Sequence, residues 1–195
     1  MAFPFFYINE YNASQKQIVL NEETSKHIVQ VLRMKVGEQL NLTDGKGSLI
    51  TCKITDDHKK HCTVEVKETR FNKQGTRKVS LSISLLKNAN RFEWFLEKAT
   101  EIGVTEMIPL LCERTEKEKF RFERLNGICI SAMLQSQQTW LPVLHQPTEF
   151  IKAVASSIAQ QKLIAHCEES SKQAISQFSN SQLTSSLIFI GPEGD

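Results

Sequence analysis

The residues with the clearest chemical potential lie at the end of the chain, where a short apolar run meets two glycines. Leu187 to Ile190 leads directly into Gly191-Pro192-Glu193-Gly194. Glycines around a proline favour a tight loop with exposed backbone, and in an open α/β sheet ligands bind at the carboxyl ends of the strands. Bare N–H and C=O groups there could hydrogen-bond an adenine edge or a ribose, although a simple surface turn is the alternative. The phosphate-loop patterns Gly-x-x-x-x-Gly-Lys and Gly-x-Gly-x-x-Gly are both missing.

Two cations follow two other expected strands of the same region. Lys87 comes after the strand expected at 79–85, and Arg114 comes after the one expected at 104–111. Because the carboxyl ends of parallel strands share one edge of a sheet, both could hold phosphate oxygens, arginine in bidentate fashion. A solvated lysine and an ion pair between Glu113 and Arg114 are the alternatives.

Two further stretches carry polar groups suited to nucleic acid. Gln135 precedes Ser136 near the end of an expected helix, and hydrogen bonding is favoured over catalysis because no strained elbow or histidine base accompanies the serine. Arg33 and Lys35 flank a turn at Gly37 and are suitable phosphate anchors. No residue can be assigned from the sequence as a catalytic base.

The charge of the chain is unevenly distributed. The 195 residues carry a formal net charge of +2, but residues 1–78 hold 13 Lys/Arg against 9 Asp/Glu, whereas residues 79–195 hold 11 against 13. A basic front half joined to a mildly acidic back half indicates that the front half meets an anion.

The five cysteines are odd in number and form no Cys-x-x-Cys pair. This pattern argues against a disulfide framework and a structural zinc site, and favours buried, reduced thiols. His58, His61 and Cys62 share one polar turn, which is weak evidence for a metal, and no metal is expected. The apolar N-terminus is too short for a signal peptide or a membrane span, so we expect a cytoplasmic protein.

The first 70 residues alternate short strands with turns, which predicts a small antiparallel barrel. A helix is expected at 22–32, with Asn21 as its cap. An Asp-Gly hairpin is expected at 44–47. The strands are expected at 17–20, 40–43, 49–54 and 63–69.

After a basic segment at 67–78 the pattern changes to alternating strands and helices, so the domain junction is placed there. This alternation predicts an α/β domain with a mainly parallel sheet and helices on both faces. The first strand alternates apolar residues with serines, as if a helix packs closely over it. Asn90 is the expected cap of the next helix, with Glu93 completing a capping box, and Gly103 is expected to end it. Strands are expected at 79–85, 104–111, 162–166 and 187–190, and helices at 90–102, 120–138, 147–160 and 168–178.

Taken in order, these pieces resemble one family along nearly the whole chain. The chain is similar to the ribosomal RNA small subunit methyltransferase E family, which belongs to the SPOUT superfamily of knotted α/β methyltransferases. The matching motifs are His27 with Val31-Leu32-Arg33-Met34-Lys35-Val36-Gly37, Leu86-Lys87, Glu97-Lys98-Ala99-Thr100-Glu101-Ile102-Gly103-Val104, Ile108-Pro109, Glu113-Arg114, Gln135-Ser136 and Ile190-Gly191-Pro192-Glu193-Gly194.

The resemblance implies a function and a domain plan. Members methylate N3 of a uridine in 16S ribosomal RNA with S-adenosylmethionine, and act as homodimers. The implied domains are a PUA-like, RNA-binding β-barrel at 1–72 and a SPOUT methyltransferase domain at 73–195. The resemblance assigns the cofactor loop to Ile190, Gly191, Pro192, Glu193 and Gly194. RNA contacts are expected from His27, Arg33, Lys35, Lys87, Arg114 and Gln135, although a helical histidine such as His27 is more often simply exposed or hydrogen-bonded.

Two departures from the family pattern stand out. Gln137 and Gln138 follow the Gln-Ser pair where the family has a small and then a basic residue. The family also continues with a helix and a Leu-Gly-x-Arg-Ile-Leu-Arg segment, whereas this sequence stops at Asp195. We therefore expect an incomplete knot in the domain and weak cofactor binding by this chain. The alternatives are a non-catalytic RNA-binding adaptor and an α/β enzyme for a small nucleotide.

Overall fold

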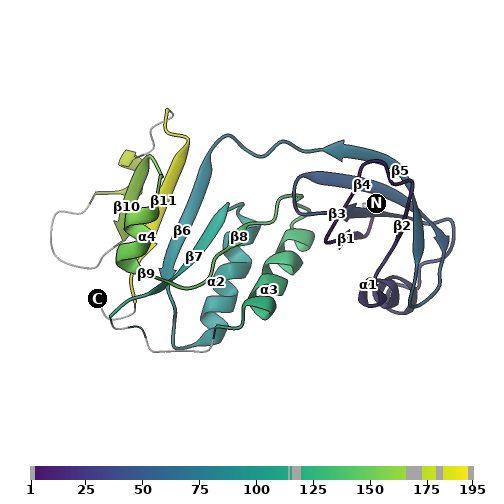
Figure 1. Ribbon diagram of the computed structural model, residues 1–195, viewed down its shortest axis with the longest axis horizontal. Helices are drawn as coiled ribbons and strands as arrows, with labels where there is room; N and C mark the ends of the chain where they lie inside the picture. The colour runs from purple at the N-terminus through teal and green to yellow at the C-terminus, as the bar shows by residue number, and fades with distance from the viewer. Residues whose placement is uncertain (1–2, 114, 116–119, 166–172, 179–181, 193–195) are drawn as a thin grey trace. The chain divides into compact units, whose positions relative to one another are not determined.

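The computed structural model describes residues 3–113, 115, 120–165, 173–178 and 182–192. The chain divides into two compact units. Unit 1 comprises Met1–Gln74 and Met133–Leu141, and unit 2 comprises Gly75–Ala132 and Pro142–Asp195. In the described part of the chain, no helix has both the length and the apolar character needed to cross a membrane. Figure 1 labels the elements of both units.

Unit 1 is built on a curled, five-stranded sheet (Figure 1). Three neighbouring pairs are antiparallel, as the sequence predicted, whereas the short first strand, which was not predicted, runs parallel to its neighbour. The spatial order is β1 (Phe5–Tyr7), β3 (Gln39–Thr43), β4 (Ser48–Asp56), β5 (Thr63–Phe71) and β2 (Gln17–Val19).

The helix of unit 1 begins where the sequence predicted. The Thr24 N–H donates to Asn21 Oδ1 at 2.8 Å, which caps α1 (Glu22–Lys26). The chain continues as a π-helical turn, η1 (His27–Val31). Beneath it lies an aliphatic core, because alternate residues of β3 and β4 point inward. Its fully buried members include Ile28, Leu40, Leu42, Ile50, Ile54 and Val64.

A segment distant in sequence completes the predicted hairpin loop at 44–47. The Gly47 N–H donates to the Thr139 carbonyl at 2.8 Å, and the Leu141 N–H donates to the Gly45 carbonyl at 2.9 Å. The Trp140 Nε1–H donates to the Asn72 carbonyl at 2.8 Å. Gly47 has a φ of +101°, and a Cβ there would lie 2.7 Å from the Trp140 ring. We call Thr139–Leu141 the clasp. Nothing in the sequence predicted it.

Unit 2 contains the parallel sheet that the sequence predicted, and every pair of its strands is parallel. The strand order is β10 (Gln161–Ala165), β11 (Ser185–Ile190), β6 (Lys78–Ser84), β7 (Glu106–Leu111) and β8 (Val143–Leu144), and β9 (Thr148–Glu149) also pairs with β7.

The helices of unit 2 correct three predictions. α4 covers only Phe150–Ser156, because Thr148 and Glu149 pair with β7 and the backbone of Ser157 is extended. Of the helix expected at 168–178, residues 168–172 lie outside the described part, and the rest holds a 3₁₀ turn, η2 (Ile175–Phe178). The helix expected at 120–138 is α3 (Phe122–Gln135).

The cap of α2 (Ala89–Glu101) is a further correction. Asn88 Oδ1 accepts from the Asn90 N–H at 3.0 Å, so Asn88 rather than Asn90 is the cap. Glu93 makes no capping box, because its carboxylate binds the Arg124 guanidinium instead. Gly103, with a φ of +83°, follows the end of the helix as predicted.

The two faces of the sheet are packed differently. The serines of β6 lie on the same face as Leu110, Leu187 and Phe189, which form a core cluster with Ala153 of α4. Ser82 and Ser84 are buried there, so the expected close covering of this face is confirmed. Figure 1 draws α2 and α3 on the side of the sheet away from α4.

Candidate ligand site at the carboxyl edge of the parallel sheet

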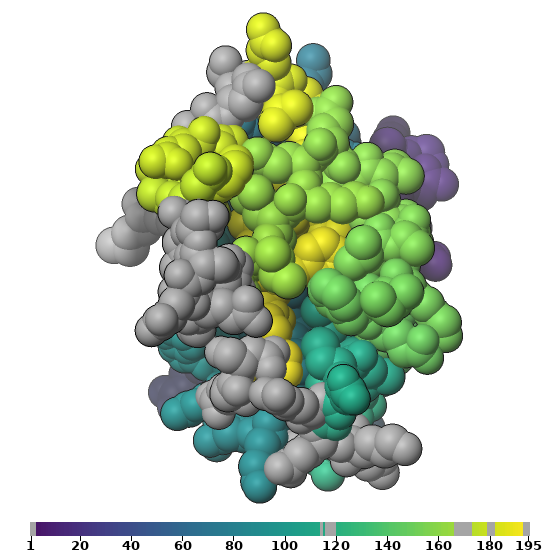
Figure 2. Space-filling model, turned by 90° about the vertical axis from the view of Figure 1, so that its left-hand side faces the viewer, coloured from purple at the N-terminus to yellow at the C-terminus, as the bar shows by residue number. Residues whose placement is uncertain are grey.

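A cavity of about 530 Å³ opens within unit 2 where β7 and β11 end and α4 begins. A site at the carboxyl edge of a parallel sheet is the arrangement expected for ligand binding in an α/β domain. Figure 2 shows yellow atoms of β11 in a hollow between the green atoms of α4 and those of β10. The lining residues are Leu110, Leu111, Cys112, Glu113, Glu149, Phe150, Ile151, Ile164, Phe189, Ile190, Gly191 and Pro192.

The walls are mainly apolar and include an aromatic pair. The rings of Phe150 and Phe189 meet edge to face, with centroids 5.4 Å apart and an interplanar angle of 75°. Ile151 and Ile164 line the same cavity but are 73% and 59% exposed. When a ligand covers apolar side chains that are exposed at a cavity, the removal of their surface from water favours binding.

Two carboxylates give the cavity an acidic side. The Cys112 N–H donates to Thr115 Oγ1 at 2.8 Å, and the same hydroxyl lies 2.8 Å from Ser84 Oγ. These bonds hold the turn that carries Glu113. Glu149 is on β9, which pairs with β7, and its carboxylate forms an ion pair with Lys152 at 3.0 Å. The combination of apolar walls, carboxylates and an open glycine backbone suits a ligand with an aromatic ring and a positive charge.

The predicted cofactor loop falls partly in this lining. Ile190, Gly191 and Pro192 line the cavity, whereas Glu193 and Gly194 lie outside the described residues. The sequence did not single out Phe150, Ile151 or Ile164. The sequence shows only that these residues are apolar, and apolar residues are equally typical of a buried helix or strand that lines no site.

The other predicted residues of unit 2 lie elsewhere or cannot be placed. Lys87 is exposed after the end of β6 and is not part of the cavity lining. Arg114 lies outside the described residues, so the predicted pairing of these two cations stays a prediction.

The predicted RNA-contacting residues of unit 1 lie on its surface. His27 is exposed, with its ring edge-on to Phe6 at 5.7 Å. Arg33 has a φ of +57°, a left-handed conformation that is uncommon outside glycine. Lys35 forms an exposed ion pair with Asp57 at 3.4 Å.

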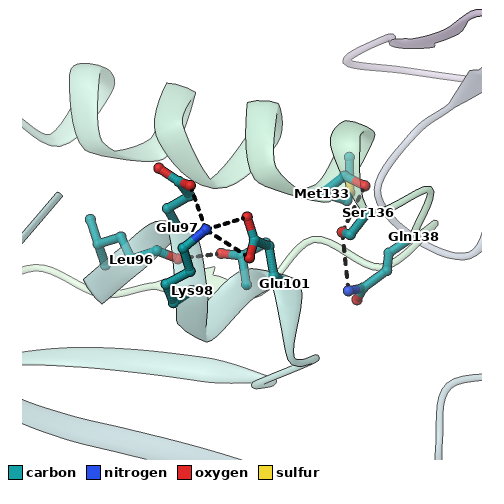
Figure 3. Close-up of polar contacts among 8 residues, drawn as sticks. Leu96, Glu97, Lys98, Glu101, Met133, Ser136 and Gln138 are labelled. Atoms are coloured by element: carbon teal, nitrogen blue, oxygen red, sulfur yellow. Dashed lines mark hydrogen bonds and ion pairs between the residues drawn. The ribbon is translucent and has the colours of Figure 1, made fainter. Parts of the chain in front are cut away.

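Gln135 is the last residue of α3 and is exposed. Beyond it, Ser136 Oγ donates to the Met133 carbonyl at 3.3 Å and accepts from Gln138 Nε2 at 3.1 Å (Figure 3). The hydroxyl is therefore held in local hydrogen bonds.

The polar residues of the motif at 97–101 also bond locally. Lys98 Nζ contacts Glu97 at 2.8 Å and both carboxylate oxygens of Glu101 at 3.0 Å (Figure 3). Thr100 Oγ1 donates to the Leu96 carbonyl at 2.8 Å. These contacts stabilise the end of α2, and none of these residues lines the cavity.

The thiols are reduced in the part of the chain that can be described. Burial raises the pKa of Cys52 to about 12 and that of Cys129 to about 11, and burial with nearby Asp56 and Asp57 raises that of Cys62 to about 11. These three thiols are poor nucleophiles at neutral pH. Cys112 is half-buried and lines the cavity. Within the described ranges, no group of three or more His, Cys, Asp or Glu residues is arranged to hold a metal.

Comparison with known proteins places both units. An RNA methyltransferase domain family matches residues 73–195, and an RNA methyltransferase PUA domain family matches residues 20–67. The ribosomal RNA small subunit methyltransferase E of Bacillus subtilis is 32% identical over 185 residues, covering 88% of this chain and 72% of that protein.

Solved structures agree with this placement. A probable rRNA-methyltransferase from Porphyromonas gingivalis superposes with a TM-score of 0.89 at 34% identity, covering 98% of this chain and 81% of the other. A putative methyltransferase from Legionella pneumophila, solved with the bound cofactor SAM, superposes with a TM-score of 0.86 at 26% identity, covering 100% and 81%.

Proposed function

This chain belongs to the ribosomal RNA small subunit methyltransferase E family, and from that premise we propose that it methylates N3 of a uridine in 16S ribosomal RNA with S-adenosylmethionine. In this reaction the imide N–H of the uridine is lost as a proton and replaced by an N–CH₃ bond. When bound, S-adenosylmethionine supplies an electrophilic methyl group on a sulfonium ion. The observation that carries the proposal is the cavity at Ile190–Pro192, formed within the residues that match the RNA methyltransferase domain.

The lining chemistry fits this cofactor. The rings of Phe150 and Phe189 and the aliphatic rim offer a dry surface for the adenine. Gly191 offers backbone groups without a side chain in front of them. The carboxylates of Glu113 and Glu149 are matched to the positive charge of the sulfonium and amino groups. Because the methyl group is already activated, the main task of these residues is to hold it in position and exclude water.

Unit 1 is proposed to bind the RNA. Residues 1–78 carry the net positive charge of the chain, and residues 20–67 match the PUA domain of RNA methyltransferases. His27, Arg33, Lys35, Lys87, Arg114 and Gln135 are proposed as RNA contacts, and Ile190 to Gly194 as the cofactor loop. We also propose that the domains span 1–72 and 73–195, that the protein forms a homodimer and that it is cytoplasmic, as the family implies.

Two measurements on the full chain test the proposal. The first is transfer of tritiated methyl groups from S-adenosylmethionine, supplied in large excess because weak cofactor binding is expected, to 30S subunits that lack the modification, with the labelled nucleotide identified by mass spectrometry. We expect label in 16S RNA on N3 of one uridine. Label on another position would correct the specificity, and RNA binding without methyl transfer would favour the adaptor.

The second measurement is cofactor binding by calorimetry with a matched pair of variants. Ile164→Ala removes a cavity residue that is 59% exposed, whereas Ile175→Ala removes one that is 64% exposed and lies outside the cavity. Losing roughly 1 kcal/mol of apolar contact should raise Kd about fivefold for Ile164→Ala and leave Ile175→Ala unchanged. Equal behaviour of the two variants would place the cofactor elsewhere.

A further inference from the structure

A second cavity, of about 370 Å³, lies in unit 2 beside the carboxyl end of β6. Leu85 and Leu86 follow that strand directly, so this cavity opens at the same edge of the sheet as the first one. Its other walls come from the first turns of α2 and α3, and it shares no residue with the first cavity. The lining residues are Leu85, Leu86, Ala89, Asn90, Phe92, Glu93, Phe120, Arg121, Arg124 and Leu125.

The lining combines an apolar floor with an excess of positive charge. Phe92 and Leu125 are buried, and Phe120 is half-buried. Two guanidinium groups and one carboxylate line the same space, which leaves the lining positive. A volume in the range of about 300–1,000 Å³ is typical of sites for small molecules or single building blocks of a polymer.

One of the two arginines is held in place. Arg124 donates from Nε and Nη2 to the two carboxylate oxygens of Glu93 at 2.7 and 3.0 Å. This bidentate pair fixes the plane of the guanidinium, and it uses two of the five N–H donors that an arginine has. A fixed guanidinium with donors remaining is suited to a phosphate oxygen. Arg121 brings a second guanidinium to the same lining.

We propose that this second cavity holds one nucleotide of the RNA substrate, with its base against Phe120 and Leu86 and its phosphate on Arg121 and Arg124. The inference rests on the proposed function. Aromatic and apolar walls accept a base of any sequence by stacking, and guanidinium groups position the backbone. A free inorganic anion would not use the apolar floor, and an apolar ligand would not use the arginines. Because β6 lies between β11 and β7, the two cavities lie at the carboxyl ends of neighbouring strands.

The test measures binding of a fluorescein-labelled hexauridylate to the full chain by anisotropy over a range of salt concentrations. Arg121→Gln should weaken binding about five- to tenfold and lower the slope of log K against log salt by about 0.7, the value for one phosphate contact on a single strand. The matched control is Lys152→Gln, which removes one charge from an exposed lysine of α4 outside the cavity. It should change affinity less than twofold.

The aromatic wall gives a second and different signature. Phe120→Leu keeps an apolar side chain but removes the ring, so affinity should fall several-fold while the salt slope stays that of the wild type. Circular dichroism checks that both variants keep the fold. A loss in Arg121→Gln no larger than in Lys152→Gln, or unchanged affinity in Phe120→Leu, overturns the inference.

The inference and the proposed function fail separately. Wild-type chain that methylates 30S subunits but does not bind hexauridylate overturns the inference and leaves the function standing. Binding that responds to the variants as described, without methyl transfer, supports the nucleotide site and overturns the enzyme assignment.

Discussion

The two units use apolar residues in different ways. In unit 1, Leu40, Leu42 and Ile50 are completely buried under a curled sheet. In unit 2, Ile151, Ile164 and Leu111 remain 73%, 59% and 40% exposed around a cavity at the sheet edge. Unit 2 has a buried core as well, which includes Leu96 and Leu187, but the apolar residues around its cavity remain available for a ligand. Substituting an apolar residue is therefore expected to affect mainly stability in the core of unit 1 and mainly ligand binding at the cavity of unit 2.

The largest effect is expected from the core of unit 1. Leu42→Ala deletes a fully buried side chain and should lower the free energy of unfolding by about 2–5 kcal/mol, because it leaves a cavity. Ile164→Ala, at the rim of the unit 2 cavity, should cost less than about 1 kcal/mol. In urea titrations, fluorescence follows unit 1 in a Trp94→Phe background, where Trp140 remains, and unit 2 in a Trp140→Phe background, where Trp94 remains. A similar loss in both variants would remove the contrast between the units.

The clasp should produce the next largest effect. Gly47→Ala combines an unfavourable φ of +101° with contacts below 3.0 Å to Trp140, Asn72 and Phe71. Gly37→Ala has a similar φ of +98°, but its nearest neighbour is a Lys53 carbon at 4.0 Å. We expect about 1 kcal/mol of destabilisation for Gly37→Ala and about 2–3 kcal/mol for Gly47→Ala in urea titrations. Equal losses would mean that the clasp adjusts without cost.

A smaller contrast concerns the cysteines. Cys112 lines the unit 2 cavity, whereas Cys52 and Cys62 are buried in unit 1 with pKa values raised to about 12 and about 11. Site-resolved mass spectrometry after iodoacetamide treatment should show Cys112 alkylated at least about tenfold faster than the other two. S-adenosylmethionine should slow the reaction of Cys112. Labelling that the cofactor leaves unchanged would count against its placement in this cavity.

The smallest contrast is between two similar ion pairs. Arg124 binds Glu93 in unit 2, and Arg70 binds Glu68 in unit 1, both in bidentate fashion. Hydrogen bonding to the arginine lowers the pKa of each carboxyl below its ordinary 4.5. The stabilisation is therefore present above pH 4.5 and is lost as the pH falls through the lowered folded-state pKa.

Glutamine substitutions test this sign. At pH 7, Glu93→Gln should cost more stability than Glu68→Gln, because the side chain of Glu93 is 20% exposed and that of Glu68 is 52% exposed. Both costs should shrink as the pH falls through the lowered pKa values of the wild-type carboxyls, because protonation removes their charge too. A difference between the two variants that does not shrink as the pH is lowered would have a cause other than charge.

The sequence predicted the elements whose signals are local. Alternation gave the strands of unit 1, and Asn21 capped its helix as expected, because a cap depends on residues three apart. The longer strands of unit 2 also followed from short patterns, whereas Glu193 and Gly194 of the predicted loop lie outside the described residues. The cap of α2 was wrong because Asn88 and Asn90 are equally good caps by type, and the pairing of Glu93 with Arg124 depends on residues 31 positions apart.

The walls of the candidate site show the same limit. Phe150 meets Phe189 only because α4 lies over β11, and no periodicity within either segment reports that contact. The helix expected at 147–160 was too long for a related reason: Thr148 and Glu149, at its expected start, pair with β7 as β9. The walls of the cavity and the length of α4 thus depend on contacts between distant segments, which local sequence patterns do not predict.

The clasp also has a consequence for the order in which the protein is made. Thr43 and Gly47 bind the Thr139 carbonyl, and Thr43 precedes Thr139 by 96 residues. At roughly 5–20 residues per second, a ribosome needs on the order of 5–20 s to add the intervening segment. Throughout that interval the Gly47 N–H lacks its native acceptor, so the hairpin reaches its final form only after translation has passed well into the second half of the chain.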